Sequence, residues 1–235
     1  MKNLSTPKIG GVIMRISRLT HILSMVCITL SYICISTVNA AEGTKIFQHG
    51  IDGYAGVEDA IITNLFVQDT NGNGVTAKEG YLRAFHQFYE ARSLIRFKNI
   101  SMPAGADFIR AELKLVVTDW NGGMMLGGYY LNSDWDIQSD SLGWKNRMNN
   151  SPWIEPGGFA DVIKGKSFII NGFSGEGVQE KIVPLDNEVV LHWLTEPASN
   201  FGILITMLDK DESAWIHSSE DPVIDYRPQL ILHYE

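Results

Sequence analysis

Residues 108–119 read FIRAELKLVVTD, and this stretch decides the fold class. Its odd positions from Ile109 to Val117 are apolar, whereas the even positions from Arg110 to Lys114 are charged. Successive side chains of a β-strand point to opposite faces, so a period of two places one face in the core and the other in solvent. The stretch therefore predicts a long, half-buried β-strand.

Further apolar or alternating runs lie on both sides of this strand, separated by Gly, Asn, Asp and Pro residues that favour turns. A long Trp-rich connection is expected over residues 132–160, between two of these runs. The other strands are expected at residues 59–68, 81–88, 93–97, 124–131, 168–172, 180–185, 202–208, 214–218 and 229–234.

One short helix interrupts this series of strands. Asp186 is a favourable N-cap, because its side chain can accept hydrogen bonds from the first backbone N–H groups of a helix that runs to Leu194. Val189, Val190, Trp193 and Leu194 would then share the buried side of the helix. Many short strands with a single helix predict an all-β fold, a jelly-roll β-sandwich.

The first 40 residues are expected to be a signal peptide and no part of the fold. They contain four basic residues and no acidic one, with an apolar stretch over 22–35 and small residues up to Ala40. The apolar stretch is shorter than the roughly 20 residues that span a membrane. We expect cleavage after Ala40, a single domain over 41–235, and a secreted, periplasmic or extracellular location. An uncleaved anchor and a start at Met14 are the alternatives.

Cleavage would change the composition of the chain. The signal contains Cys27 and Cys34, the only cysteines, so the mature chain has no disulfide. The charged residues of the signal are all basic. The net charge of the mature chain is therefore more negative than the formal net charge of -8 of the full sequence. An acidic surface argues against nucleic acid as a partner, because phosphate binding depends on Lys and Arg. No later stretch is apolar enough for a transmembrane anchor.

An ordered series of short motifs runs from Arg92 to Tyr234. In chain order they are Leu94-Ile-Arg96-Phe97, Pro103-Ala-Gly105-Ala106, Ala111-Glu-Leu113-Lys-Leu115, Trp135, Trp144-Lys-Asn146, Trp153-Ile-Glu-Pro156-Gly157-Gly158, Trp193-Leu194, Asn200-Phe-Gly202-Ile203, Ser218-Ser219-Glu220 and Arg227-Pro228-Gln-Leu230.

This series resembles the DNRLRE-type domain, which is also classed as carbohydrate-binding module family 96. The resemblance covers nearly all of the mature chain if Asp59 is the Asp of the family's opening strand. It implies a jelly-roll β-sandwich and polysaccharide binding, with alginate as one ligand type. Two differences are Gly143, which stands where the family has Thr, and a long loop that we expect over 164–180.

Aromatic and basic residues are the candidates for sugar binding, because sugar C–H groups stack on aromatic faces and guanidinium or ammonium groups bind carboxylates. Trp144, Trp153 and Trp193 are expected to pack in the core, since large aromatic residues are mostly buried. The other candidates lie at strand ends or on strand faces, where Arg83 and Lys114 can also merely solvate the face. The predicted ligand-binding residues are Trp120, Tyr129, Tyr130, Trp135, Arg83 and Lys114.

The loop that starts at Asp69 has the oxygen spacing of a calcium loop, with Asn71, Asn73 and a turn glycine after them. Glu79 lies one position before the usual bidentate glutamate, so the loop is not a regular EF-hand. We predict a structural calcium ion on Asp69, Asn71, Asn73 and Glu79, with a simple Asn-Gly turn as the alternative. The pairs Glu58 and Asp59, or Glu220 and Asp221, are further candidates for calcium ligands.

No catalytic residues are predicted. A carboxylate pair can cleave a glycoside, but the acidic residues in and beside the Trp-rich connection suit a solvated loop equally well, and no serine lies in a nucleophile-elbow motif. We therefore predict a secreted, non-catalytic polysaccharide-binding module for an alginate-like or other cell-wall or matrix polysaccharide, acting alone or with a separate polysaccharide-degrading enzyme. The alternatives are a structural or adhesive β-sandwich of a cell surface or matrix, and a glycan-cleaving enzyme. The acidic residues in question are Asp134, Asp136, Asp140, Glu155 and Asp161.

Overall fold

Antiparallel strands make up most of the part of the chain that the computed structural model describes, which is residues 42–64, 81–86, 89–119, 123–175 and 177–235. All of these residues belong to the unit that starts at Ala41. The strands are β1 (Gly43–Gln48), β2 (Val57–Thr63), β3 (Tyr81–His86), β4 (Glu90–Phe97), β5 (Phe108–Asp119), β6 (Leu126–Leu131), β7 (Asn146–Met148), β8 (Ser151–Pro152), β9 (Val162–Ile170), β10 (Gly177–Pro184), β11 (Ile203–Met207), β12 (Ser213–His217) and β13 (Gln229–Tyr234). The helices are α2 (Asn187–Thr195) and the 3₁₀ turns η1 (Pro197–Ser199) and η2 (Ile224–Tyr226).

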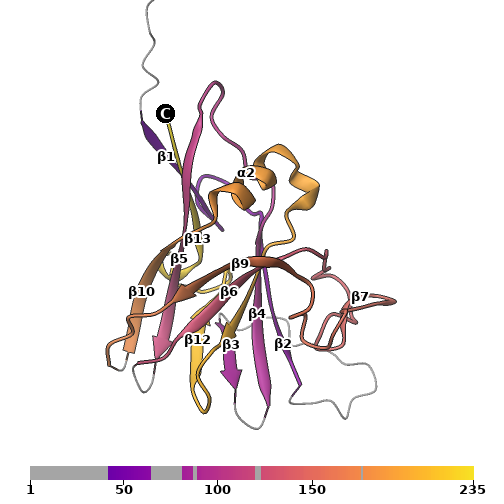
Figure 1. Ribbon diagram of the computed structural model, residues 1–235. Coiled ribbons are helices and arrows are strands. Elements are labelled where there is room, and N and C mark those ends of the chain that lie inside the picture. Colours follow the sequence, from indigo (N-terminus) through magenta and orange to yellow (C-terminus); the bar gives the residue numbers. More distant parts are fainter. Residues whose placement is uncertain (1–41, 65–80, 87–88, 120–122, 176) are drawn as a thin grey trace, which may run out of the picture. The chain divides into compact units, whose positions relative to one another are not determined.

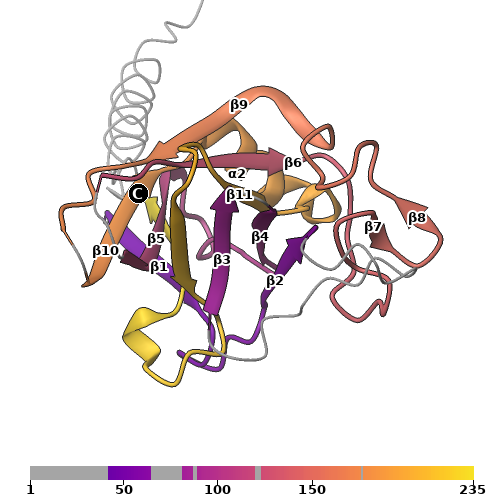
Figure 2. The same ribbon diagram turned by 90° about the horizontal axis from the view of Figure 1, so that it is seen from below.

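Strand pairing forms two groups. The first group has the order β1-β13-β5-β10, and the second has the order β2-β4-β11-β6-β9. The pair β12-β3 joins them, because β12 pairs with the end of β5 and β3 pairs with the start of β4. Figures 1 and 2 show β1, β5 and β10 together on one side of this unit and β2 on the other. The predicted all-β sandwich with one short helix is confirmed.

The main core lies between the two groups of strands. Leu113 and Leu115 of β5 are fully buried and share one hydrophobic cluster with Ile95 of β4 and Leu126 of β6. Complete burial of each such side chain contributes roughly 1.5–3 kcal/mol. The predicted alternation of β5 is confirmed from Ala111 to Leu115, and beyond it Val116 and Val117 are both buried.

Ile109 is the exception to this alternation, because its side chain is 40% exposed. The pairing of β5 with β13 shifts register at this point: Arg110 lies opposite His233, and Phe108 lies opposite Tyr234. Ile109 is therefore the extra residue of a β-bulge, which turns its side chain away from the core.

A second core lies under the Trp-rich connection. Trp135 and Trp153 cluster there with Ile62 of β2, Leu94 of β4 and Leu204 of β11. Both tryptophans are almost completely buried, and both satisfy their indole N–H: Trp135 donates to the Phe201 carbonyl (2.8 Å) and Trp153 to the Gly143 carbonyl (2.8 Å). The Trp-rich connection is thus a cover for one face of the second group of strands.

Helix α2 begins where the sequence predicts. Asp186 is its N-cap and accepts hydrogen bonds from the backbone N–H groups of Glu188 (3.0 Å) and Val189 (3.2 Å). Trp193 on the buried side of the helix belongs to the main core. In the described part of the chain, no helix is long and apolar enough to cross a membrane.

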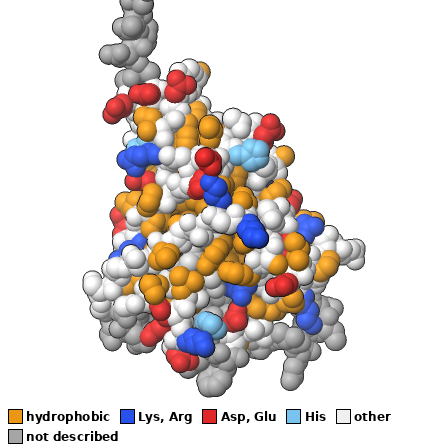
Figure 3. Space-filling model, viewed as in Figure 1, with side chains coloured by type: hydrophobic (Ala, Val, Ile, Leu, Met, Phe, Trp, Pro, Cys, Tyr) orange, Lys and Arg blue, Asp and Glu red, His pale blue; other side chains and the backbone are white. Residues whose placement is uncertain are grey.

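β1, β7 and β8 lie where no strand was predicted. β9 overlaps the strand predicted at 168–172 but begins at Val162, so the first part of the loop expected over 164–180 is strand. In β9, two lysines and Gly165 interrupt the apolar pattern, and the strand forms one end of the sheet path, where burial on both faces is not required. Figure 3 shows that hydrophobic side chains, coloured orange, remain at the surface over β9 and β10.

Candidate functional site

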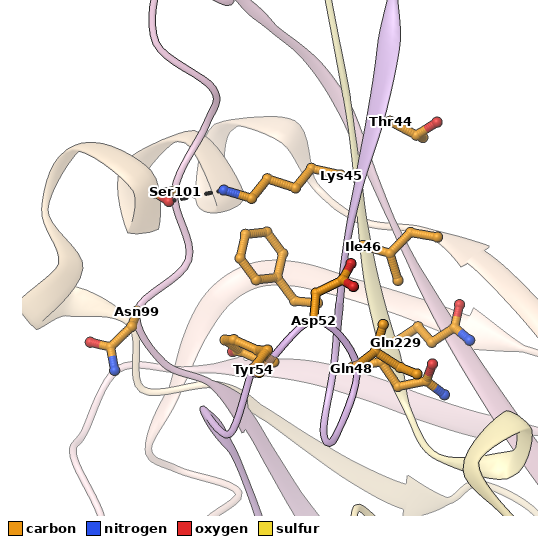
Figure 4. A pocket seen from close by; sticks show the side chains of 12 residues that line it. Thr44, Lys45, Ile46, Gln48, Asp52, Tyr54, Asn99, Ser101 and Gln229 are labelled. Carbon is orange, nitrogen blue, oxygen red and sulfur yellow. Dashed lines mark hydrogen bonds between the residues drawn. The ribbon is translucent and has the colours of Figure 1, made fainter.

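The β1 groove is an open cavity of about 650 Å³ that is lined by Thr44–Gln48 of β1, the turn Ile51–Tyr54, Asn99, Ser101 and Gln229. A volume of this size lies within the range of small-molecule sites. Figure 4 shows Lys45 reaching toward Ser101, with Asp52 and Tyr54 below it and Asn99 on the far side. The side chains of Thr44 and Ile46 project from the opposite side of β1.

The local backbone explains why these side chains face one another. The turn after β1 is closed by two backbone hydrogen bonds of 2.8 Å, from Gly50 to Tyr54 and from Tyr54 to Ile51. Asp52 at its tip has a φ of 49°, and Asn99 across the groove has a φ of 56°. Asp and Asn are the side-chain-bearing residues that enter this left-handed region most easily. Both polar side chains are thereby placed at loop tips beside β1.

Two aromatic rings form the floor and one wall of the β1 groove. The rings of Phe47 and Tyr54 meet edge to face, with their centroids 5.1 Å apart. Phe47 is buried, whereas Tyr54 is half-buried and presents part of its ring to the groove. The Tyr54 hydroxyl donates a 2.7 Å hydrogen bond to the Lys98 carbonyl. Burial, assisted by the negative charge of Glu58, raises the pKa of this phenol above its usual value, so it stays a neutral donor.

The rim of the groove is polar and carries both signs of charge. The Lys45 ammonium lies 5.1 Å from the centre of the Phe47 ring and donates to the Ser101 hydroxyl (3.2 Å). Asp52 and Asn99 are exposed on the rim, so their carboxylate and amide groups are free to meet a ligand. One ammonium, one carboxylate and an amide beside an aromatic ring can bind hydroxyl groups, which both donate and accept hydrogen bonds.

The structure places two of the predicted ligand-binding residues in the cores. Tyr130 is fully buried, and its hydroxyl accepts a hydrogen bond from the Asp186 backbone N–H (2.6 Å). Trp135 is buried under the cation of Arg96, whose guanidinium lies 4.7 Å from the indole ring. A ligand platform requires an exposed ring face, so neither residue is available for stacking in this structure.

The other described candidates lie outside the β1 groove. Tyr129 is half-buried, and its ring meets Phe159 edge to face at 4.8 Å. Arg83 of β3 stacks on Trp215 at 4.9 Å. Lys114 of β5 forms a 2.7 Å ion pair with Glu180. The structure therefore does not bring the predicted residues together in one site. Tyr129, Arg83 and Lys114 each contact a different partner.

Trp120 and the predicted calcium ligands Asp69, Asn71, Asn73 and Glu79 lie outside the described residues. Within the described ranges, no group of three or more His, Cys, Asp or Glu side chains is arranged to hold a metal ion. The calcium loop stays a prediction.

His217 of β12 lies between two polar partners. Its Nδ1 is 2.6 Å from the Asp221 carboxylate, and its Nε2 is 3.1 Å from the Thr118 hydroxyl. The side chains of His217 and Asp221 are only 3% exposed, and the Tyr226 ring packs on the imidazole at 4.8 Å. Because the imidazole is enclosed in this way, we assign it the structural role of fixing the loop after β12.

The residues of the β1 groove could be found only in part from sequence. Thr44–Gln48 reads TKIFQ, which alternates polar and apolar residues, and this pattern is the signal of a strand. Nothing in the sequence indicates that Asn99 and Ser101 lie across from it, because those residues are more than 50 positions away.

The chain was compared with protein-family models and with curated proteins, and neither comparison found a match. The resemblance to the DNRLRE-type domain therefore stays a prediction that rests on the motifs quoted above.

Proposed function

We propose that this protein is an exported, non-catalytic polysaccharide-binding module and that the β1 groove is its binding site. The observation that carries the proposal is the half-buried Tyr54 ring beside the exposed Asp52 and Asn99 and the Lys45 ammonium. Aromatic stacking together with a few placed polar groups is how a preformed groove binds a sugar.

The charges of the rim favour a neutral or weakly charged chain. Lys45 and Asp52 bring opposite charges to the groove, so a polyanion would meet repulsion at Asp52 as well as attraction at Lys45. The mature chain is also acidic overall, which adds long-range repulsion for an anionic polymer at low salt. Neutral glucans are therefore expected to bind more tightly than alginate.

The test is affinity electrophoresis of the 41–235 protein through gels that contain a neutral glucan, pectin or alginate. Tyr54→Ala and Lys45→Ala are expected to lose retardation. Tyr129→Ala, a half-buried tyrosine outside the groove, and Lys210→Ala, an exposed lysine, are the matched controls and should keep it. Retardation that is lost in Tyr129→Ala but kept in Tyr54→Ala would place the site elsewhere. Absence of retardation of the unmodified protein in every gel would overturn the proposal for these polymers.

A second candidate function is adhesion through an apolar surface. Ile169 of β9 and Val178 and Ile182 of β10 are between 50% and 55% exposed. Contiguous exposed apolar residues are typical of protein contact sites. Sedimentation velocity over a range of concentrations would test this function. Self-association that Ile182→Glu abolishes would favour it, and a monomer at all concentrations would count against it.

A further inference from the structure

Asp59 of β2 is a buried acid with one unsatisfied oxygen. Its side chain points to the same face as Val57, which is in the main core, and the residue is only 2% exposed. The Oδ2 atom accepts a 2.7 Å hydrogen bond from the Ser219 backbone N–H, whereas Oδ1 has no hydrogen-bond partner. A buried carboxylate oxygen without a partner is strongly unfavourable.

A second carboxylate, that of Glu220 on the loop after β12, lies next to Asp59. The Ser219 hydroxyl donates to the Glu220 carboxylate (2.9 Å), while the Ser219 backbone binds Asp59, so both acids converge on one fully buried serine. Burial and then the negative charge of Glu220 raise the pKa of Asp59 well above its usual range. Glu220 is therefore close enough for its carboxylate to disfavour the ionised form of Asp59.

The described part of the chain offers no basic side chain to neutralise them. No ion pair links Asp59 or Glu220 to a Lys, Arg or His residue there, although other acids of the protein have such partners. The neighbouring Arg227 is directed elsewhere, since it donates to the backbone carbonyls of Asp221 (2.7 Å) and His49 (3.0 Å). Two facing carboxylates without a basic partner need either a shared proton or a cation between them.

We propose that Asp59 and Glu220 bind one divalent cation of the calcium class. All of the available donors are oxygens: Asp59 Oδ1, the Glu220 carboxylate and the Ser219 hydroxyl. Hard cations such as calcium prefer oxygen ligands, whereas zinc favours nitrogen and sulfur. Glu220 is exposed, so water can reach the cation and complete its coordination.

This site does not need three acidic residues, because calcium accepts hydroxyl, carbonyl and water oxygens beside carboxylates. With two carboxylates from the protein, the expected Kd lies in the roughly 10⁻⁴–10⁻³ M range of extracellular calcium modules. The cation would fasten β2 to a loop that is 160 residues away in the chain. It is distinct from the predicted calcium loop at 69–74 and independent of the sugar ligand.

The experiment is a calcium titration of the metal-stripped 41–235 protein, followed by calorimetry and by the thermal unfolding midpoint. We expect one equivalent to bind and 10 mM calcium chloride to raise Tm by about 2–5 °C. Glu220→Gln should abolish both effects while leaving the circular dichroism spectrum intact, because Glu220 is exposed. Asp225→Asn, an exposed acid of the same loop, is the matched control and should keep both.

Asp69→Asn separates the two calcium hypotheses. If the response to calcium persists in Asp69→Asn and disappears in Glu220→Gln, the proposal stands. A response that disappears in Asp69→Asn and persists in Glu220→Gln places the cation in the 69–74 loop and overturns it. An unmodified protein with no response to calcium, magnesium or chelator overturns it as well, and leaves a shared proton as the link between the two acids.

Discussion

The Trp-rich connection and the β1 groove use aromatic residues in opposite ways. The connection holds Trp135 and Trp153, which are buried and have their indole N–H groups bonded to backbone carbonyls. The groove has no tryptophan and exposes part of a single tyrosine, Tyr54, beside polar side chains. In this protein, the aromatic residues that are dense in sequence pack in a core and cover one face of the strands. Their density in the sequence does not by itself indicate a sugar-binding surface.

Among the changes that test this comparison, removal of Trp135 is expected to have the largest effect on the free energy of unfolding. Trp135→Ala leaves a cavity in the second core and an unpaired Phe201 carbonyl, so the free energy of unfolding should fall by about 3–5 kcal/mol. Urea unfolding at 25 °C measures this loss. Sugar retardation of the folded protein should be unchanged. A stable Trp135→Ala variant that loses retardation would show that the connection, and not the groove, contacts the sugar.

Ionisation of Asp59 is expected to have the next largest effect, because a buried carboxyl group is costly to ionise. Burial and the nearby Glu220 charge raise the pKa of this carboxyl to about 8 in the folded protein, whereas its unfolded value is about 3.9. Between these values the folded state binds more protons, so this group stabilises the fold below about pH 4 and loses that contribution as pH rises to about 8. In chelator, Tm should therefore decrease more between pH 5 and pH 8 in the unmodified protein than in Asp59→Asn.

The informative quantity is the difference in Tm between the unmodified protein and Asp59→Asn at each pH, since the contributions of the other titrating groups cancel in it. Equal pH profiles for Asp59→Asn and the unmodified protein would mean that Asp59 is ionised in the folded state throughout this range. Saturating calcium should reduce the difference if the cation proposed above binds there.

Loss of the Tyr54 ring tests whether the β1 groove binds the polysaccharide through this aromatic side chain. Tyr54→Ala should weaken polysaccharide binding by about tenfold or more. Stacking of a nucleic-acid base on an aromatic side chain contributes roughly 1–3 kcal/mol, and we expect a stacked sugar face to contribute at the lower end of that range. Tyr54→Phe removes only the hydroxyl that bonds the Lys98 carbonyl, and should keep most of the binding. Dissociation constants from affinity electrophoresis measure both, and equal loss in the two variants would contradict a stacking role.

Lys114 is expected to show the smallest effect. Its ion pair with Glu180 joins β5 and β10 on the outer face, where such pairs contribute about 0–1 kcal/mol. Lys114→Ala should lower the unfolding free energy by no more than this amount and leave sugar binding unchanged. A large loss of binding would support the sequence-based hypothesis that Lys114 contacts a ligand carboxylate.

The parts of the fold that sequence predicted correctly are those with strong local signals. β5 and β13 have the predicted bounds, because each alternates or runs apolar over its whole length. Helix α2 was predicted from the cap at Asp186, which the structure shows in place. β1 and β9 carry weaker patterns. They are the two ends of the sheet path, and a strand at the end of a sheet tolerates polar residues and glycine.

The candidate site could not be predicted in the same way. Tyr130 and Trp135 have the residue types of a sugar platform, but burial depends on what covers a side chain, and the cover comes from segments far away in the sequence. Asp59 was paired with Glu58 as a candidate calcium ligand from the sequence, and only the fold brings it to Ser219, 160 residues later.

The sequence by itself thus determined the strand periodicity, the helix cap and the burial of Trp153 and Trp193, because these follow from local chemistry and from hydrophobicity. The tertiary structure alone decided which aromatic ring borders an open groove and which two acids face each other. Those properties arise from contacts between distant segments, whose distances in space are set by the packing of the two groups of strands and not by the order of residues along the chain.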